Sequence, residues 1–241
     1  MDRLLLSDDI SNGKERTKIP VYNDYDDEGV PNFVYLNRCV PEPSATTSRC
    51  CPGACDENCP CSSNVYKDQR VQRPSKLANI LTECGPGCSC DIDCSNRLSQ
   101  QGVRYPLEIF KTNGRGWGVR VKSTIPSGAV IAEYTGELSF DEMVEQNEHS
   151  YGTLSGENDV IINATNQGNV TRFINHSCNA NVFAVRVKQT GDPLEHIVIF
   201  CIYKVYEGQE LALNYGNPWW QIMESRFNLK CSCGSTTCRY S

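Results

Sequence analysis

The chain has 241 residues, of which 39% are hydrophobic and 22% charged, a composition that supports a folded core and excludes disordered and collagen-like proteins. No stretch approaches the roughly 20 consecutive apolar residues that span a bilayer. The formal net charge of −6 argues against duplex DNA as the main ligand and favours a basic peptide.

The N-terminal segment, residues 1–38, is polar and acidic around the run NDYDDEG and contains two prolines. Its apolar run is only LLL before charges begin, so we expect no signal peptide and a reducing compartment. Prolines and turn-forming residues disfavour a long regular element. We therefore expect an extended segment that wraps another part of the protein.

A first cysteine cluster follows in the runs RCCPGACDENCPC and ECGPGCSCDIDC. Cysteines so closely spaced in a reducing compartment favour zinc over disulfides. Two separate tetrahedral sites use eight thiolates and leave one over, whereas three zinc ions are satisfied by nine thiolates if three of them bridge. Spacing alone favours neither the two separate sites nor the three-zinc cluster. The nine candidate ligands are Cys50, Cys51, Cys55, Cys59, Cys61, Cys84, Cys88, Cys90 and Cys94.

Short β-type runs separated by turns occupy the region from 107 to 215 and predict a β-rich fold. Helical character is limited to FDEMVEQN, the stretch around SKLANIL, and WWQIMESRF near the C-terminus. The β-type runs are LEIF, WGVRV, VIAEY, VIIN, VFAVRV, HIVIFCIY and ELALNY.

The tail CSCGSTTC supplies only three thiolates, so a closed zinc site needs a fourth ligand from elsewhere. Cys178, in the run RFINHSC, is the natural donor, and Cys39 and Cys201 are left over. The predicted ligands of this site are Cys178, Cys231, Cys233 and Cys238.

Taken together, these segments resemble the SET-domain histone-lysine methyltransferases that carry pre-SET and post-SET zinc modules. The resemblance rests on CSCDIDCSNR, GWGVR, IAEYTGEL, RFINHSCNAN, ELALNYG and the closing CSCG. The segments SDDISNGKE, IPVYN and NYGNPWW look most like the euchromatic branch, which methylates the ninth-position lysine of histone H3. The resemblance also favours the three-zinc cluster in the first module.

The fold that this resemblance implies is mainly β: a SET-domain core with a knot-like C-terminal threading of ELALNYG past RFINHSC, flanked by the two zinc modules. The implied domains are an N-terminal wrapping segment (1–38), a pre-SET zinc cluster (39–103), a SET catalytic domain (104–217) and a post-SET zinc tail (218–241).

The implied cofactor is S-adenosylmethionine, beside one zinc in the tail and three in the first cluster. Tyr215 is the implied catalytic tyrosine, with Tyr151 as its partner near the cofactor. Most tyrosines are half-buried side chains that only pack, and most single histidines are core residues. The assignments of Tyr215, Tyr151 and His176 therefore rest on the motifs around them. The implied cofactor-binding residues are Arg115, Gly116, Trp117, Tyr151, Arg172, Asn175, His176 and Trp219.

Three positions depart from the family pattern: Leu213 where Phe or Tyr is usual, Asn214 where Asp is usual, and Asn163 where an acidic residue is usual. These departures bear on peptide selectivity and methylation number more than on catalysis. Glu157 and Asp159 are candidates to complement an arginine that precedes the target lysine. Because leucine has no hydroxyl and is smaller than an aromatic ring, we expect mainly dimethyl-lysine, with trimethyl-lysine as a further product.

The resemblance implies the histone H3 N-terminal tail and chromatin-associated proteins as partners and the nucleus as location, with no membrane and no sequence-specific DNA binding. Two alternatives stay open. In the first, the chain is a catalytically silent chromatin-binding module. In the second, it is a methyltransferase for a lysine of a non-histone protein.

Overall fold

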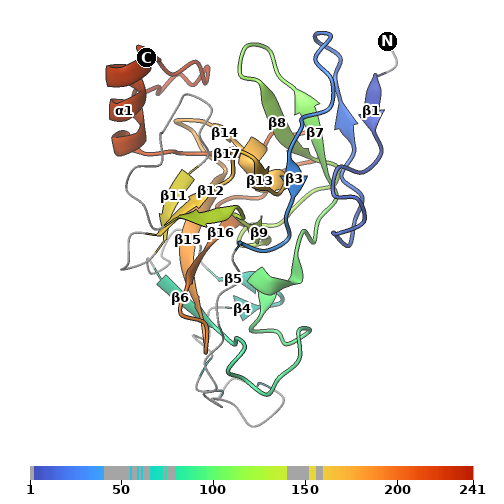
Figure 1. Ribbon diagram of the computed structural model, residues 1–241, viewed down its shortest axis with the longest axis vertical. Helices are drawn as coiled ribbons and strands as arrows, with labels where there is room; N and C mark the ends of the chain where they lie inside the picture. Colours follow the sequence, from blue (N-terminus) through green and yellow to red (C-terminus); the bar gives the residue numbers. More distant parts are fainter. Residues whose placement is uncertain are drawn as a thin grey trace.

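The computed structural model describes residues 3–40, 55, 59, 61, 66–72, 74, 80–139, 152–155 and 160–240, with the backbone alone over 152–155. Within these residues the protein consists of short β-strands, 3-10 turns and one α-helix, α1 (Asn217–Phe227) (Figure 1). This confirms the prediction of a mainly β fold. No helix among the described residues has the length and apolar character to cross a membrane.

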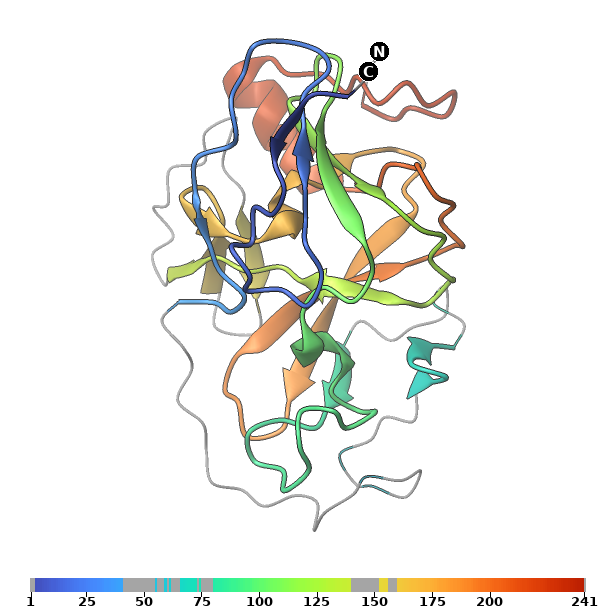
Figure 2. The same cartoon turned by 90° about the vertical axis from the view of Figure 1, so that its right-hand side faces the viewer.

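A four-stranded sheet joins the N-terminal segment to the middle of the chain. Its order is β1 (Leu5–Ser7), β2 (Val21–Tyr22), β7 (Leu107–Lys111) and β8 (Trp117–Val121). β7 and β8 form an antiparallel hairpin, and β2 lies parallel to β7. The first residues thus extend the sheet of the hairpin on its β7 side, and Figure 2 shows this segment (dark blue) beside it.

The largest sheet places distant segments side by side. Its order is β14 (Asn175–His176), β17 (Ala212–Leu213), β15 (Val182–Gln189), β16 (Glu195–Cys201) and β9 (Val130–Glu133), and β6 (Ile80–Glu83) also pairs with β15. Every residue of β16 is buried, as its nearly continuous apolar run predicts. β14 and β17 pair in parallel, so RFINHSC and ELALNY are neighbours in space.

The remaining elements are short. β10 (Glu137–Ser139), β12 (Val160–Asn163) and β11 (Gly152–Ser155) form a three-stranded sheet. β13 (Gln167–Gly168) pairs with β3 (Val34–Tyr35), and β4 (Tyr66–Lys67) pairs with β5 (Arg70–Val71). The 3-10 turns are η2 (Leu98–Gln101) and η3 (Val170–Phe173).

The predicted helices have three different outcomes. The stretch WWQIMESRF lies in α1, which confirms that prediction. The prediction around SKLANIL is wrong at its end, because Ile80 and Leu81 begin β6, whose pairing with β15 outweighs local helix preference. The stretch FDEMVEQN lies outside the described residues.

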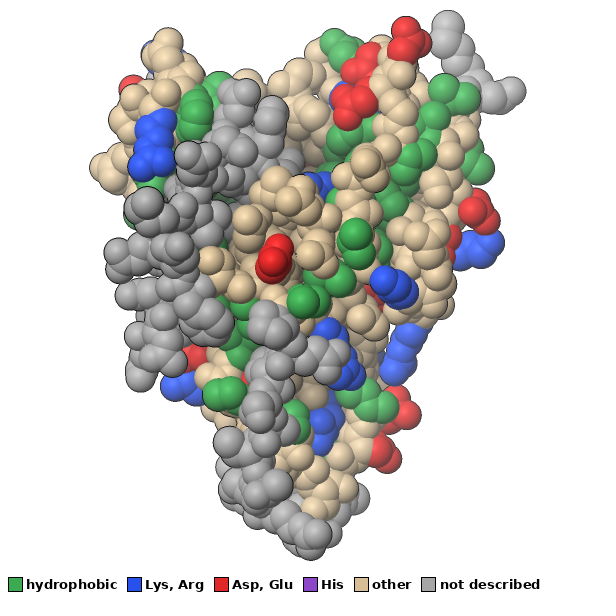
Figure 3. All heavy atoms as spheres, viewed as in Figure 1, with side chains coloured by type: hydrophobic (Ala, Val, Ile, Leu, Met, Phe, Trp, Pro, Cys, Tyr) green, Lys and Arg blue, Asp and Glu red, His purple; other side chains and the backbone are tan. Residues whose placement is uncertain are grey.

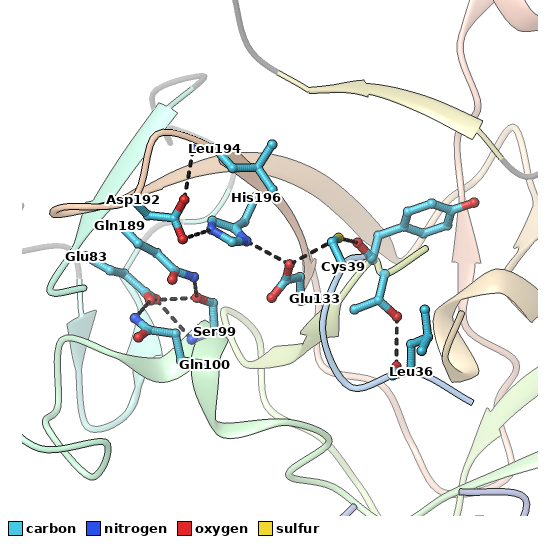
Figure 4. A network of polar contacts seen from close by, with 12 residues as sticks. Leu36, Cys39, Glu83, Ser99, Gln100, Glu133, Gln189, Asp192, Leu194 and His196 are labelled. Atoms are coloured by element: carbon cyan, nitrogen blue, oxygen red, sulfur yellow. Dashed lines mark hydrogen bonds and ion pairs between the residues drawn. The ribbon is translucent and has the colours of Figure 1, made fainter. Parts of the chain in front are cut away.

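A buried carboxylate fastens β6 to the turn η2. Glu83 is fully buried and accepts hydrogen bonds from the backbone N–H of Ser99 at 3.0 Å and from its hydroxyl at 2.6 Å. Gln100 donates to it at 3.1 Å (Figure 4). The Tyr66 hydroxyl also donates to it, at 2.6 Å. Because an unpaired buried carboxylate is costly, these four donors fix the cysteine-rich region against the main sheet.

A second buried network lies next to it, around His196 of β16. Its Nδ1 lies 2.7 Å from the Glu133 carboxylate of β9, and its Nε2 lies 3.2 Å from the Asp192 carboxylate (Figure 4). The thiol of Cys39 points at Glu133, with the sulfur 3.7 Å from the oxygen. Burial lowers the pKa of His196, but the two carboxylates outweigh burial and raise this pKa to about 10.

Replacement of His196 by Gln is expected to destabilise the protein by about 3 kcal/mol at pH 6, because two buried carboxylates then lose their cationic partner. Since the folded pKa is raised, the stabilisation is complete below the ordinary pKa of about 6.5 and is lost as the pH rises towards 10. Urea unfolding of parent and variant at pH 6 and pH 10 checks this. A stability difference that does not shrink at the higher pH contradicts it.

Candidate active site and zinc-binding flank

The tip of the β7–β8 hairpin carries three of the predicted cofactor residues, Arg115, Gly116 and Trp117. Gly116 has a φ of 64°, a left-handed conformation that favours glycine. The Arg115 guanidinium Nη2 lies 2.7 Å from the Glu210 carboxylate Oε2. This turn therefore aims Arg115 at the segment that leads into β17.

Glu210 joins residues from three parts of the chain. Its Oε1 accepts a hydrogen bond from the Asn175 amide at 2.9 Å, and the same amide donates to the Trp117 carbonyl at 3.1 Å. Arg115, Trp117 and Asn175 are thus gathered around one carboxylate. Glu210 was not among the residues predicted from the sequence. It is the first residue of the β-type run ELALNY, and a charged residue in such a run was the one sign that it has a polar partner.

His176 links this group to the C-terminal tail. Its Nδ1 accepts hydrogen bonds from the Tyr215 backbone N–H at 3.1 Å and from the Trp220 indole at 3.4 Å. Burial lowers the pKa of His176 to about 4, so the ring is neutral near pH 7. Because Nδ1 accepts, the proton lies on Nε2, which is 3.4 Å from the sulfur of Cys178.

Tyr215, the predicted catalytic residue, is held at both ends. Its hydroxyl donates to the Ile174 carbonyl at 2.7 Å, and its ring meets His176 edge-on at 5.3 Å between centroids. The Trp219 ring lies 4.8 Å from the Tyr215 ring, at 77°. The aromatic cluster at this end of the molecule comprises His176, Tyr215, Trp219, Trp220 and Tyr240.

The tail sulfurs gather beside this aromatic cluster. The ligand atoms of His176, Cys178, Cys231 and Cys233 all lie within 4.8 Å of one another, and the sulfur of Cys238 is 3.8 Å from that of Cys178. Two thiolates on one tetrahedral zinc at about 2.3 Å lie about 3.8 Å apart, so the sulfurs fit this metal.

The fourth ligand of this site is decided by hydrogen bonding. A zinc-bound His176 Nε2 would carry no proton, and Nδ1 would then have to donate, yet Nδ1 already accepts from two N–H groups. This favours Cys238 as the fourth ligand and leaves the Nε2–H of His176 to donate to the Cys178 sulfur. Burial raises the pKa of Cys233, but hydrogen bonds from backbone and neighbouring sulfurs lower it to about 6, which favours the thiolate.

The first cysteine cluster is described at seven of its nine predicted ligands, and Cys50 and Cys51 lie outside the described residues. Cys84 belongs to two metal-ligand groups, one with Cys59 and Cys61 and one with Cys55, Cys90 and Cys94. The sulfurs of Cys88 and Cys61 are 3.4 Å apart. A thiolate shared by two groups is what a bridged zinc cluster requires.

Donor groups surround these sulfurs, as they do around metal-bound thiolates. The Arg97 guanidinium donates to the Cys90 sulfur at 3.2 Å, and the Asn96 amide donates to the Cys84 sulfur at 3.4 Å. A disulfide at Cys61 is the alternative state of this sulfur, and it is incompatible with zinc ligation by the same atom. Because zinc clusters of thiolates also crowd sulfur atoms, metal content decides between the two states.

Other predicted residues lie apart from Glu210 or outside the described part. The Arg172 guanidinium donates to the carbonyls of Ala164 and Thr165, at 2.7 and 2.9 Å, and lies 4.7 Å over the rings of Phe33 and Phe173. These contacts hold the turn between β12 and β13. The predictions for Tyr151, Glu157 and Asp159 fall outside the described side chains.

The three departures from the family pattern occupy different settings. Leu213 is half-buried in β17, where it pairs with His176 and Val182 and packs against the main core. Asn214 is exposed, and its side chain accepts from the Gly216 backbone N–H at 3.0 Å. Asn163 lies at the end of β12 and accepts from the Thr165 backbone N–H at 2.9 Å.

A strand-rich core with β14 paired to β17, flanked by two cysteine groups, defines the class of protein. The SET domain model matches residues 116–216, and the Pre-SET motif model matches residues 11–97. The chain therefore belongs to the SET-domain family and carries a Pre-SET motif.

Curated relatives with similar sequences are histone-lysine N-methyltransferases. The chain is 34% identical to the H3 lysine-9 specific SUVH5 of Arabidopsis thaliana over 95% of its own length and 31% of that protein. It is 33% identical to human EHMT1 over 98% of its length and 20% of that protein. The chain thus spans a third or less of these relatives. Its identity to SUVH5 and to EHMT1, a euchromatic methyltransferase, is nearly equal.

Among solved structures, the chain is similar to KRYPTONITE in complex with mCHH DNA, an H3(1-15) peptide and SAH. The TM-score is 0.82 at 31% identity, over 98% of this chain and 53% of that one. The predicted SET-domain fold is therefore supported by similarity over nearly the whole chain, and not by short sequence motifs alone.

Proposed function

We propose that this chain transfers methyl groups from S-adenosylmethionine to the lysine at the ninth position of histone H3. The observation that carries the proposal is the convergence of Arg115, Trp117 and Asn175 on Glu210, beside His176 and Tyr215. The names of SUVH5 and EHMT1, and the peptide and SAH in the KRYPTONITE complex, support the substrate and the cofactor.

The chemistry asks little of the protein beyond geometry and exclusion of water. The reaction is an in-line displacement in which a neutral amine attacks the sulfonium methyl carbon and the thioether leaves, and bound S-adenosylmethionine would supply that methyl group. In this proposal the Tyr215 hydroxyl, which donates to the Ile174 carbonyl, orients the lysine amine. Burial of the amine away from water, beside the packed rings of Tyr215 and Trp219, favours its uncharged form.

The two zinc modules complete the proposal. Nine thiolates of the first cluster hold three zinc ions, and Cys178, Cys231, Cys233 and Cys238 hold one. The domains are a wrapping segment (1–38), a pre-SET zinc cluster (39–103), a SET catalytic domain (104–217) and a post-SET zinc tail (218–241). Partners are the histone H3 tail and chromatin-associated proteins, and the location is the nucleus, in line with relatives that act on histones.

A labelled-methyl transfer assay across a panel of histone peptides tests this function. We expect transfer to an H3 peptide that contains lysine 9 and none to the same peptide with arginine at that position. Transfer only to non-histone proteins supports the second enzymatic alternative. Peptide binding without any transfer supports a silent chromatin-binding module.

Replacement of Leu213 by Tyr is expected to shift the product from dimethyl-lysine towards monomethyl-lysine. The added hydroxyl fixes a water molecule or the amine in the channel, and each 1.36 kcal/mol in barrier changes a rate about tenfold. Mass spectrometry of an H3 peptide after exhaustive reaction measures the product. Leu213→Phe is the matched control, since it adds a ring without a hydroxyl.

Two results contradict this expectation. A parent enzyme that yields only monomethyl-lysine removes its basis. An unchanged product in Leu213→Tyr means that Leu213 acts as core, in line with its packing, and that Phe183 or Trp220 controls the channel.

A further inference from the structure

The acidic loop, residues 23–28, follows β2 and is organised by one buried amide. Asn23 is 2% exposed, and its side chain donates to Asp26 Oδ1 at 2.8 Å and to the Glu28 carbonyl at 2.7 Å. Its Oδ1 accepts from the backbone N–H groups of Tyr25 and Asp26, at 3.0 and 3.1 Å. The loop therefore has a defined shape rather than being a solvated acidic run.

This loop lies on the tip of the β7–β8 hairpin. The Tyr25 hydroxyl donates to Asn113 Oδ1 at 2.7 Å. The Lys111 ammonium, on a side chain only 8% exposed, pairs with Asp26 at 3.4 Å and with Glu28. Figure 3 shows Asp and Glu side chains at the upper end of the molecule, where Figure 1 places β1 and this hairpin.

Glu28 also reaches the predicted cofactor residue Trp117. Its Oε1 accepts the indole Nε1–H at 2.8 Å, and the Lys111 ammonium lies 5.1 Å over the same ring. The backbone carbonyl of Trp117 accepts from the Asn175 amide at 3.1 Å. Trp117 is thus fixed by its ring to the N-terminal loop and by its backbone to the residues around Glu210.

We propose that Glu28 is a positioning residue that orients the Trp117 indole in the wall of the cofactor site, an inference that rests on the proposed function. Glu28 lies within the Pre-SET match, 89 residues from Trp117. The Pre-SET region then has a role at the cofactor site that is separate from zinc binding. Because the Glu28 side chain is 54% exposed, the effect is moderate.

The test compares Glu28→Ala and Glu28→Gln in the full chain with the matched control Asp8→Asn, which removes an exposed ion pair to Lys18 in the same N-terminal segment. The readouts are the indole N–H resonances in a proton–nitrogen NMR spectrum, SAH affinity by calorimetry, and kcat and KM for S-adenosylmethionine. The Trp117 resonance is assigned by its loss in Trp117→Phe.

In Glu28→Ala the Trp117 resonance moves upfield while those of Trp219 and Trp220 stay in place. The Kd for SAH and the KM for S-adenosylmethionine rise about 3- to 10-fold, the range of one partly exposed hydrogen bond to a charged group, with kcat nearly unchanged. Glu28→Gln keeps an acceptor oxygen, so it shifts the resonance less and retains most of the affinity. Asp8→Asn changes none of these values.

A Trp117 resonance that does not move overturns the proposal, as does one that moves without a change in SAH affinity. If Glu28→Ala loses cooperative thermal unfolding, Glu28→Gln decides by the resonance alone: a smaller upfield shift supports the proposal, and an unmoved resonance overturns it. A parent protein that binds no SAH refutes the proposed function instead, while the indole resonance still reports whether Glu28 holds Trp117.

Discussion

Replacement of Tyr215 by Phe is expected to lower methyl transfer about 10²- to 10³-fold, the typical effect of removing one preorganised hydrogen-bonding group from a reacting centre. The hydroxyl is fixed by the Ile174 carbonyl at 2.7 Å, so its loss removes a group of defined position. The ring keeps its contacts with His176 and Trp219. Steady-state turnover on an H3 peptide measures the effect.

The matched control is Tyr240→Phe, which removes a hydroxyl from the same aromatic cluster at a ring stacked on Trp220. Its turnover should stay close to that of the parent. SAH binding and the unfolding temperature of Tyr215→Phe should change little, because one hydrogen bond contributes about 1 kcal/mol. Turnover of Tyr215→Phe near the parent value ends the assignment of Tyr215.

Removal of zinc is expected to abolish the cooperative thermal transition of the protein. Among the described residues, the cluster around Cys59 and Cys84 consists of cysteines alone, so the metal supplies much of the organising free energy. At the tail, metal loss also frees the Cys178 sulfur, which lies 3.4 Å from His176 Nε2, and so weakens the support that His176 gives to the Tyr215 backbone. Scanning calorimetry before and after chelation measures the loss.

Metal analysis of the untreated protein should give about four zinc ions per chain. A value near three means that the first module holds two ordinary sites. Cys61→Ser should lower the content if Cys61 is a zinc ligand and leave it unchanged if Cys61 is disulfide-bonded, and Cys39→Ser is the control outside both clusters. A cooperative transition that survives complete metal removal refutes the coupling of zinc to folding.

The strands were predictable where burial leaves a local pattern. The buried run of β16 and the hairpin of β7 and β8 are visible in their apolar and β-branched residues. The strand at residues 80 and 81 was not predictable, because the local run ANIL suits a helix. These residues are a strand because they pair with β15. Pairing partners far along the chain leave no trace in a local window.

The site was predictable only in part for the same reason. Short motifs singled out Arg115, Trp117 and Asn175, but nothing in the sequence says that Glu210 joins them. The contact between Glu28 and Trp117 is even harder to predict from a local sequence pattern, because the two residues are 89 positions apart. Acidic residues in an acidic loop look like solvated surface until their partners are known.

The parallel pairing of β14 with β17 also bears on synthesis of the chain. Asn175 and His176 leave the ribosome well before their partners Ala212 and Leu213, and the tail cysteines Cys231, Cys233 and Cys238 follow these partners. Contacts of this sequence separation form late, because the intervening chain must first close a loop. A nascent chain that ends before residue 210 lacks both Glu210 and Tyr215, so the proposed site forms only after β17 has been made.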